Sequence, residues 1–241
     1  MKWVRFQRTG RDDAERGTTD GVAIHAGGET LRFEDVRLLP PCTPTKIVCV
    51  GRNYAAHAAE LGNEVPERPL LFLKPPSALL GSGEDLILPP SEEVHYEAEL
   101  AVVIGRRCRN VSAAAARDVI LGYTCMNDIS DRVAQKWEKS WVRAKAFDGS
   151  APLGPLLVTP DEVTEPFHVR LRLNGETRQD GWTNAFIFTV PELIEEITSF
   201  MTLEPGDVIA TGTPAGVGRL CAGDVVEVDI EGIGVLRNPV R

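Results

Sequence analysis

The stretch Glu97-Ala-Glu-Leu-Ala-Val-Val-Ile104 decides the fold, because two acids stand at its entrance and only apolar residues follow them. Successive side chains of a strand point to opposite faces, so Glu97 and Glu99 share one face. The apolar residues after them leave neither face polar. This stretch is therefore predicted to be a buried strand that carries two neighbouring carboxylates at its mouth.

Two carboxylates in such a place repel each other, and one of them takes up a proton unless a cation compensates. Hard divalent ions such as Mg²⁺ accept oxygen ligands of this kind. Asp128 ends a second apolar segment, Tyr123-Thr-Cys-Met-Asn127, and is a plausible third ligand. A Glu-x-Glu pair also fits an exposed strand face, so the spacing alone leaves a cation site and a solvated surface both open.

Outward from this stretch, the sequence predicts a β-rich α+β domain, because strands do not alternate regularly with helices. Asn174-Gly175 follows one alternating segment and is a strong hairpin signal. The further strands are expected at residues 46–51, 70–73, 123–126, 169–173, 208–210, 225–230 and 234–236.

Three helices are expected, at residues 54–61, 113–121 and 191–201. Asn53 is the expected cap of the first helix, while Ser112 begins the second and Gly122 ends it. The glycine-rich segment Thr211–Gly218 is not preceded by a βα unit and lacks the Gly-Lys-Ser/Thr of a P-loop. It therefore does not indicate nucleotide binding.

The chain is predicted to divide into a small N-terminal β-domain, residues 1–43, and a main domain, residues 44–241. Short alternating segments separated by turn-rich pieces fill the first part. The segment Leu39-Pro-Pro-Cys-Thr-Pro44 is proline-rich and is typical of a linker.

Composition narrows the classes of function. The 241 residues include 26 Lys and Arg against 35 Asp and Glu, and the resulting formal charge of −9 argues against a nucleic-acid partner. No apolar stretch is long enough for a membrane span, and the N-terminus lacks a signal-peptide core. The five cysteines show no Cys-x-x-Cys spacing, so we expect buried free thiols and a cytoplasmic protein.

Several ordered blocks make the chain resemble the fumarylacetoacetate hydrolase family from about residue 45 to residue 241. Two of them are Val50-Gly-Arg-Asn-Tyr-Ala-Ala-His57 and Gly122-Tyr-Thr-Cys-Met-Asn-Asp128. The others lie at residues 71–77, 96–105, 144–148, 154–155, 174–175, 179–181 and 203–218. The resemblance implies a mixed β-roll core with a small N-terminal β-domain, a homodimer, bound Mg²⁺ or Mn²⁺, and chemistry on small anionic 2-oxo acids.

The resemblance also assigns site residues. It implies that Glu97, Glu99 and Asp128 bind the metal, which are the three carboxylates that the strand pattern indicates. It further implies a His57 and Glu60 pair on a short lid helix, where residues three apart share a face. Glu60 would hold the imidazole, and His57 would deprotonate a water molecule.

The remaining candidates are positively charged or polar. Lys145 is expected to stabilise an oxyanion or a substrate carboxylate. The head of the 2-oxo acid is expected to contact Arg132 and Gln135, with Thr213 as a further donor and Arg52 near the lid helix. Each of these residues would otherwise be an ordinary surface or turn residue.

The leading hypothesis is a Mg²⁺-dependent carbon–carbon bond hydrolase or decarboxylase that acts on a small 2-oxo acid through a metal-stabilised enolate. Acylpyruvate, fumarylpyruvate and oxaloacetate are the substrate types considered. The alternative is a 2-hydroxyhepta-2,4-diene-1,7-dioate isomerase or a 5-carboxymethyl-2-oxo-hex-3-ene-1,7-dioate decarboxylase of aromatic catabolism. Asp131, Trp182 and Asn184 depart from the commoner family pattern and leave the substrate open, with Asp131 expected as an extra carboxylate near the site.

Overall fold

The computed structural model describes residues 1–241 and consists mainly of β-strands. A twelve-stranded sheet has the order β4-β3-β2-β1-β13-β11-β10-β16-β6-β7, with β5 paired to β1 and β8 paired to β13. Most pairs are antiparallel, but β16 with β6 and β13 with β8 are parallel. The prediction of a β-rich α+β fold is therefore confirmed.

The strands and helices have the following bounds. The large sheet contains β1 (Lys2–Arg8), β2 (Ala14–Thr19), β3 (Ile24–Ala26), β4 (Glu29–Leu31), β5 (Val36–Leu39), β6 (Ile47–Gly51), β7 (Leu70–Lys74), β8 (Leu79–Leu80), β10 (Ala98–Ile104), β11 (Ile120–Asn127), β13 (Ala151–Val158) and β16 (Val208–Ala210). A three-stranded sheet contains β9 (Val94–Tyr96), β12 (Ser130–Asp131) and β17 (Gly218–Arg219), and a four-stranded sheet contains β14 (His168–Leu173), β15 (Glu176–Trp182), β18 (Val225–Ile230) and β19 (Gly234–Pro239). The α-helices are α1 (Ala55–Glu60), α2 (Arg132–Trp137), α3 (Val142–Lys145) and α4 (Val190–Phe200).

Strand β10 lies between β11 and β16 in the large sheet, and all seven of its residues are buried. Its alternate side chains belong to different cores: Leu100 and Val102 join a cluster of 36 buried residues, while Ala101 and Val103 join one of 12. Burial on both faces is the physical reason why this strand is apolar without interruption after Glu99.

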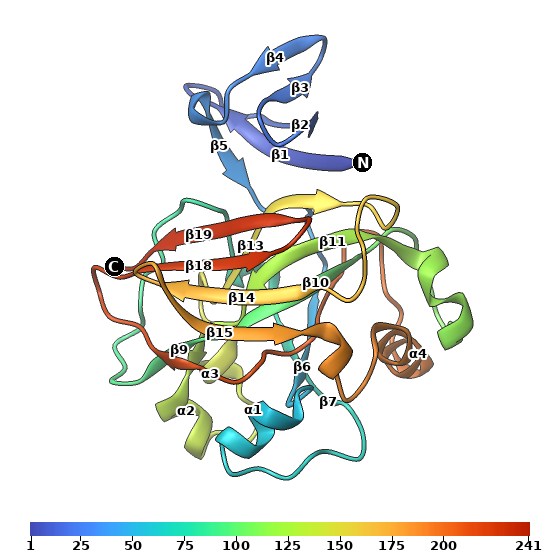
Figure 1. The fold of residues 1–241 in the computed structure, drawn as a ribbon, viewed down its shortest axis with the longest axis vertical. Helices are drawn as coiled ribbons and strands as arrows, with labels where there is room; N and C mark the ends of the chain where they lie inside the picture. The colour runs from blue at the N-terminus through green and yellow to red at the C-terminus, as the bar shows by residue number, and fades with distance from the viewer.

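The four-stranded sheet supplies much of the larger core. Strands β14, β18 and β19 lie across the large sheet near β10, β11 and β13 (Figure 1). Their inward residues, such as Val169, Leu171 and Val228, belong to the same cluster as Leu100. Strand β15 forms the outer edge of this sheet, on the side where α1 and α2 lie in Figure 1.

The first five strands form a lobe at the N-terminal end, which stands apart from the main body in Figure 1. Strand β1 connects this lobe to the main sheet through two residue pairs with β13, Lys2 with Val158 and Trp3 with Leu157. The chain then leaves the lobe through β5 and enters the main body at β6. The lobe therefore extends the sheet at the edge opposite to β7.

Several local predictions are wrong. The alanine-rich segment forms a 3-10 helix over Ala113–Val119, and β11 begins at Ile120, because this part of the chain pairs with β10. Gly122 consequently lies within a strand, where an added Cβ would come 2.5 Å from the carbonyl oxygen of Val158. Asn53 does not cap α1, since that position is taken by Tyr54, which makes no side-chain cap.

The structure also describes the cysteines and the length of the helices. All five cysteines are free, and four of them are buried, but Cys221 is exposed. None of the helices is long and apolar enough to cross a membrane.

Helix α4 starts with a capping box in which Thr189 and Glu192 satisfy each other's backbone, so it begins as the Pro191 and early-glutamate pattern indicated.

Candidate active site

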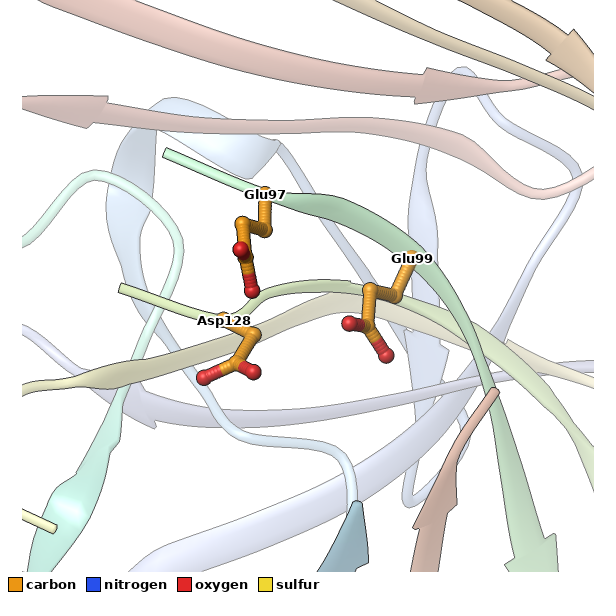
Figure 2. Close-up of side chains that lie close together, drawn as sticks. All are labelled: Glu97, Glu99 and Asp128. Carbon is orange, nitrogen blue, oxygen red and sulfur yellow. The ribbon is translucent and has the colours of Figure 1, made fainter. Parts of the chain in front are cut away.

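Three buried carboxylates come together where β10 and β11 meet. Glu97 stands between β9 and β10, Glu99 lies on β10, and Asp128 follows the last residue of β11. The register pairs Ala98 with Asn127, and the Asp128 N–H donates to the Glu97 carbonyl at 2.8 Å. Ligand oxygens of all three acids lie within 4.8 Å of one another, and Figure 2 shows the carboxyl groups on one side of the two strands.

Two of these carboxylates are compensated by positive charge. The Nζ atom of Lys145 donates to Glu97 Oε2 at 2.6 Å and to Asp128 Oδ2 at 2.7 Å. Arg132 forms an ion pair with the other oxygen of Glu97. The Lys74 Nζ atom lies 2.8 Å from Asp128 Oδ1, although the angles are not those of a hydrogen bond.

Glu99 lacks such a partner. Its Oε2 accepts a hydrogen bond from the Gly212 N–H at 2.8 Å, and no lysine or arginine pairs with it. Burial, followed by repulsion from Asp128 and Glu97, raises the pKa of Glu99 well above its ordinary value. Burial acts in the same direction on Glu97, but the charges of Arg132 and Lys145 outweigh it and hold the pKa of that acid well below its ordinary value.

The three acids suit a hard divalent cation. All donors are carboxylate oxygens, the acids are 4%, 2% and 1% exposed, and the buried Oδ1 atom of Asp128 accepts no hydrogen bond. A cation beside Glu99 would also neutralise the one acid of the group that no side chain compensates. Mg²⁺ and Mn²⁺ both accept a set of oxygen ligands of this kind.

Lys74 belongs to this site although no role was predicted for it. It is fully buried, and its Nζ atom donates to three backbone carbonyls, those of Ile129, Lys145 and Ser150. A lysine at the end of the apolar strand Leu70–Lys74 was the available signal, since a buried ammonium needs partners. Lys74 thus links β7 to the segments that carry Asp128 and Lys145.

His57 and Glu60 form a pair on helix α1. The Nδ1 atom of His57 lies 3.2 Å from Glu60 Oε2, so Nδ1 carries the proton of this contact when the imidazole is neutral, and Nε2 is left as the basic nitrogen. Glu60 Oε1 accepts a hydrogen bond from the Gly216 N–H at 2.9 Å. The histidine is buried, while Glu60 is partly exposed and is held between the helix and the glycine-rich loop.

A cavity of about 290 Å³ joins the two groups. Its wall contains the three acids, His57 and Lys145, and also the predicted substrate contacts, which are Arg52, Arg132, Gln135 and Thr213. Glu60 is outside the wall and contacts it through His57. Asp131 does not supply an extra acid to the site, because it caps α2 by accepting from the Val133 and Ala134 N–H groups.

The glycine-rich loop is fitted closely around the site. Gln179, a second residue without a predicted role, accepts from the Ala98 N–H at 2.9 Å and donates to Thr213 Oγ1 at 2.7 Å. Gly212 and Gly216 have φ values of +97° and +101°, and a Cβ at Gly216 would lie 2.1 Å from the Arg178 carbonyl oxygen. These contacts fix Thr213 in the wall and the Gly216 N–H against Glu60.

His95 lies on β9, outside the cavity wall. Its Nε2 atom is 3.6 Å from Glu93 Oε1, and burial together with the charge of Arg132 lowers its pKa. The structure therefore places this histidine among the neighbours of Arg132 and not among the candidate ligands.

Comparisons with known proteins point to one family. A family model described as fumarylacetoacetate (FAA) hydrolase C-terminal matches residues 46–241. Among curated relatives, an uncharacterised protein of Archaeoglobus fulgidus is 48% identical, with 97% of this chain and 94% of that protein covered. The oxaloacetate tautomerase YisK of Bacillus subtilis is 43% identical, with 89% of this chain and 76% of that protein covered. The crystal structure of 2-hydroxyhepta-2,4-diene-1,7-dioate isomerase from Mycobacterium marinum superposes with a TM-score of 0.90 at 40% identity, covering 100% of this chain and 98% of that one.

Proposed function

Because the chain belongs to the fumarylacetoacetate (FAA) hydrolase family, we propose that it is a metal-dependent enzyme that interconverts the keto and enol forms of a small 2-oxo acid of the oxaloacetate type. The observation that carries this proposal is one cavity that contains both a buried histidine base and a buried group of three acids. Proton transfer next to a carbonyl needs a base at the carbon and stabilisation at the oxygen.

The reaction moves one proton and breaks no carbon–carbon bond. His57 Nε2 takes a proton from the carbon next to the keto group, and the electron pair shifts onto the keto oxygen. The protonated imidazole then releases that proton, directly or through water, to the keto oxygen, which gives the enol and restores the base. Glu60 keeps the imidazole oriented and stabilises its protonated form through Nδ1. A divalent ion held by Glu97, Glu99 and Asp128 would supply Lewis acidity toward the keto oxygen.

Lys145 and Arg132, the other cations of this proposal, position the acids. Lys145 fixes Glu97 and Asp128 relative to each other, and Arg132 fixes the other side of Glu97 while donating to Gln135 at 2.8 Å. Gln135 and Thr213 remain the polar contacts that we propose for the 2-oxo acid head. In this proposal Lys145 acts first on the acids, and only through them on the substrate.

A second candidate is hydrolysis or decarboxylation at a carbon–carbon bond of the same substrate class. The arrangement of His57 favours it, because a histidine oriented by a glutamate can deprotonate a water molecule as well as a carbon acid. An isomerase reaction on a diene-dioate is the third member of this group, and it needs proton transfer without water attack. All three reactions pass through an enol or enolate, so the fate of that species separates them.

One set of assays distinguishes the candidates. Exchange of the C3 protons of oxaloacetate into D₂O, followed by NMR, reports tautomerisation, while pyruvate release from oxaloacetate or acetylpyruvate reports decarboxylation or hydrolysis. We expect exchange that EDTA abolishes and that His57→Gln reduces about 10²–10⁴-fold, the usual contribution of a general base. His168→Gln is the matched control, since His168 also pairs with a carboxylate, at 2.6 Å from Asp180, but lies outside the cavity. Full activity of His57→Gln, or activity indifferent to EDTA, would refute the proposal.

We also propose that the chain works as a homodimer. Support comes from an apolar surface next to the cavity, where Leu73 and Val142 are 50% and 58% exposed and share a hollow with Phe72 and Trp141. Phe72 and Trp141 belong to the cavity wall as well. Light scattering on the purified protein measures the mass in solution, and a monomer at micromolar concentration would contradict this proposal.

A further inference from the structure

Two residues of the cavity wall have unusual backbone conformations. Four residues other than glycine have positive φ, and two of them are asparagines, which tolerate this region. The other two are Arg52, with φ of 59°, and Trp141, with φ of 57°, and both line the cavity. Conformations of this kind persist where the surrounding structure holds them, and they concentrate at binding sites.

The segments before and after Arg52 are held in place and so constrain its backbone conformation. Asn53 is fully buried, and its side chain donates to the carbonyls of Thr211 and Phe188 and accepts from the Phe188 N–H. The Asn53 carbonyl accepts from the Ile187 N–H at 2.8 Å. These bonds fix the chain immediately after Arg52, and β6 fixes it immediately before.

Arg52 is also the one lysine or arginine of the cavity wall without a carboxylate partner. Arg132 pairs with Glu97, Lys145 pairs with Glu97 and Asp128, and Lys136 pairs with Glu93. The side chain of Arg52 makes no ion pair within 4.0 Å and no hydrogen bond to the protein, although the residue is only partly exposed. In a chain with net charge −9, an unpaired guanidinium on a concave wall is an available anion contact.

The charge of the site is consistent with a second anionic group on the ligand. The three acids are balanced by three buried cations, Lys74, Arg132 and Lys145, so Arg52 adds positive charge to a neutral arrangement. Any divalent ion bound by the acids would add more. With a divalent ion bound, a ligand with two carboxylates therefore compensates more of this positive charge than a ligand with one.

We propose that Arg52 binds the second carboxylate of a small 2-oxo dicarboxylate and thereby selects dicarboxylates over 2-oxo monocarboxylates. This inference rests on the proposed function, since it assumes that the first carboxylate and the keto oxygen of the substrate lie beside Glu97, Glu99 and Asp128. The cavity of about 290 Å³ is at the low end for ligand sites, which favours a short substrate. The planar fork of arginine suits a carboxylate better than a lysine ammonium does.

The test compares oxaloacetate with 2-oxobutyrate, which has the same four carbons but a methyl group in place of the second carboxylate. C3 proton exchange is measured by NMR for both compounds, and their binding is measured by calorimetry. For the wild type we expect a preference for oxaloacetate. For Arg52→Gln we expect kcat/KM for oxaloacetate to fall about 10- to 100-fold while that for 2-oxobutyrate stays within about twofold, the size expected when one charge-assisted contact is lost.

Further variants separate charge from backbone conformation. Arg52→Lys should recover part of the preference, and Arg52→Asn, which tolerates the left-handed backbone, should lose the preference without losing thermal stability. Equal losses for both compounds in Arg52→Gln would overturn the inference, as would loss of the preference in Lys136→Gln instead. If wild-type protein exchanges neither compound, the proposed function fails. The binding preference in calorimetry then decides the role of Arg52 by itself, and equal binding of the two compounds overturns it.

Discussion

Replacement of Asp207 by asparagine should destabilise the protein strongly although Asp207 is outside the active-site cavity. The side chain is fully buried and accepts five hydrogen bonds, which tie the linker before β6 to the turn before β16. Its Oδ1 atom accepts from the Thr45 N–H and hydroxyl at 2.8 and 2.7 Å and from the Lys46 N–H at 3.1 Å. Its Oδ2 atom accepts from the Lys46 ammonium and from the Glu204 N–H at 2.8 Å.

The size of the effect follows from the best orientation that asparagine can take. The amide oxygen can replace Oδ1 and keep three bonds, but the NH₂ group then faces the Lys46 ammonium and the Glu204 N–H. One bond to a charged donor is lost, and one backbone N–H is left unpaired against another donor. Losses of these two kinds cost about 1.5–3 and about 1–3 kcal/mol, so we expect a destabilisation of about 2.5–6 kcal/mol. At about 2–4 °C per kcal/mol for a chain of this size, the melting temperature should fall by about 5–24 °C.

The pH dependence gives an independent check. Burial opposes ionisation of Asp207, but the Glu204 N–H, Lys46 and Thr45 outweigh it and lower the pKa of this acid below its ordinary value. A depressed pKa in the folded state adds stability that is fully present above the unfolded value of about 3.9 and is lost as the pH falls through the folded pKa. Thermal unfolding of wild type and Asp207→Asn should therefore differ most at neutral pH and converge below about pH 4. A constant difference down to acid pH, or a melting temperature within about 2 °C of wild type at pH 7, would refute this reasoning, and Asp35→Asn on the surface is the control.

Three further changes should have distinct outcomes. Glu99→Gln should weaken Mg²⁺ and Mn²⁺ binding in calorimetry by tenfold or more, yet keep or raise the melting temperature in EDTA, because it removes the one acid of the group without a positive partner. Lys74→Met should lower stability by about 3–5 kcal/mol in denaturant unfolding, since Asp128 loses a buried cation and three carbonyls lose a buried donor. Gly216→Ala should reduce turnover more than substrate binding, because a Cβ pressed against the Arg178 carbonyl displaces the N–H that holds Glu60.

The acid group could be predicted because its signal is local. The side-chain period of two in a strand predicts that Glu97 and Glu99 share one face. In the structure β10 pairs with β11, so the apolar segment that ends at Asp128 lies beside them. The cations could not be assigned in this way. Lys74 contacts Asp128 only because β7 pairs with β6, Ile47 opposite Lys74, while β6 lies two strands from β10 in the sheet. No local pattern encodes that order of strands.

The wrong local predictions have the same origin. Ala113–Val119 has the composition of an α-helix, but the residues that follow pair with both β10 and β13, and this pairing shortens the helix to a 3-10 segment. Asn53 has the side chain of a helix cap, but it makes three hydrogen bonds to distant loops instead. In both cases contacts between segments far apart in sequence override a local preference.

The distribution of positive charge around the three acids explains why Glu99 is the acid that depends on a bound cation. A buried carboxylate with a matched cation is stable without a further partner, and Glu97 and Asp128 each have two cations near them. If Glu99 were paired with a cation in the same way, a divalent ion would have to displace that cation to bind. Leaving Glu99 with only the Gly212 N–H keeps the protein stable when the acid is protonated and makes ionised Glu99 available to a cation. The same arrangement depends on the surrounding cations, so loss of Lys145 or Lys74 should weaken Mg²⁺ or Mn²⁺ binding by the three acids more than loss of any surface charge.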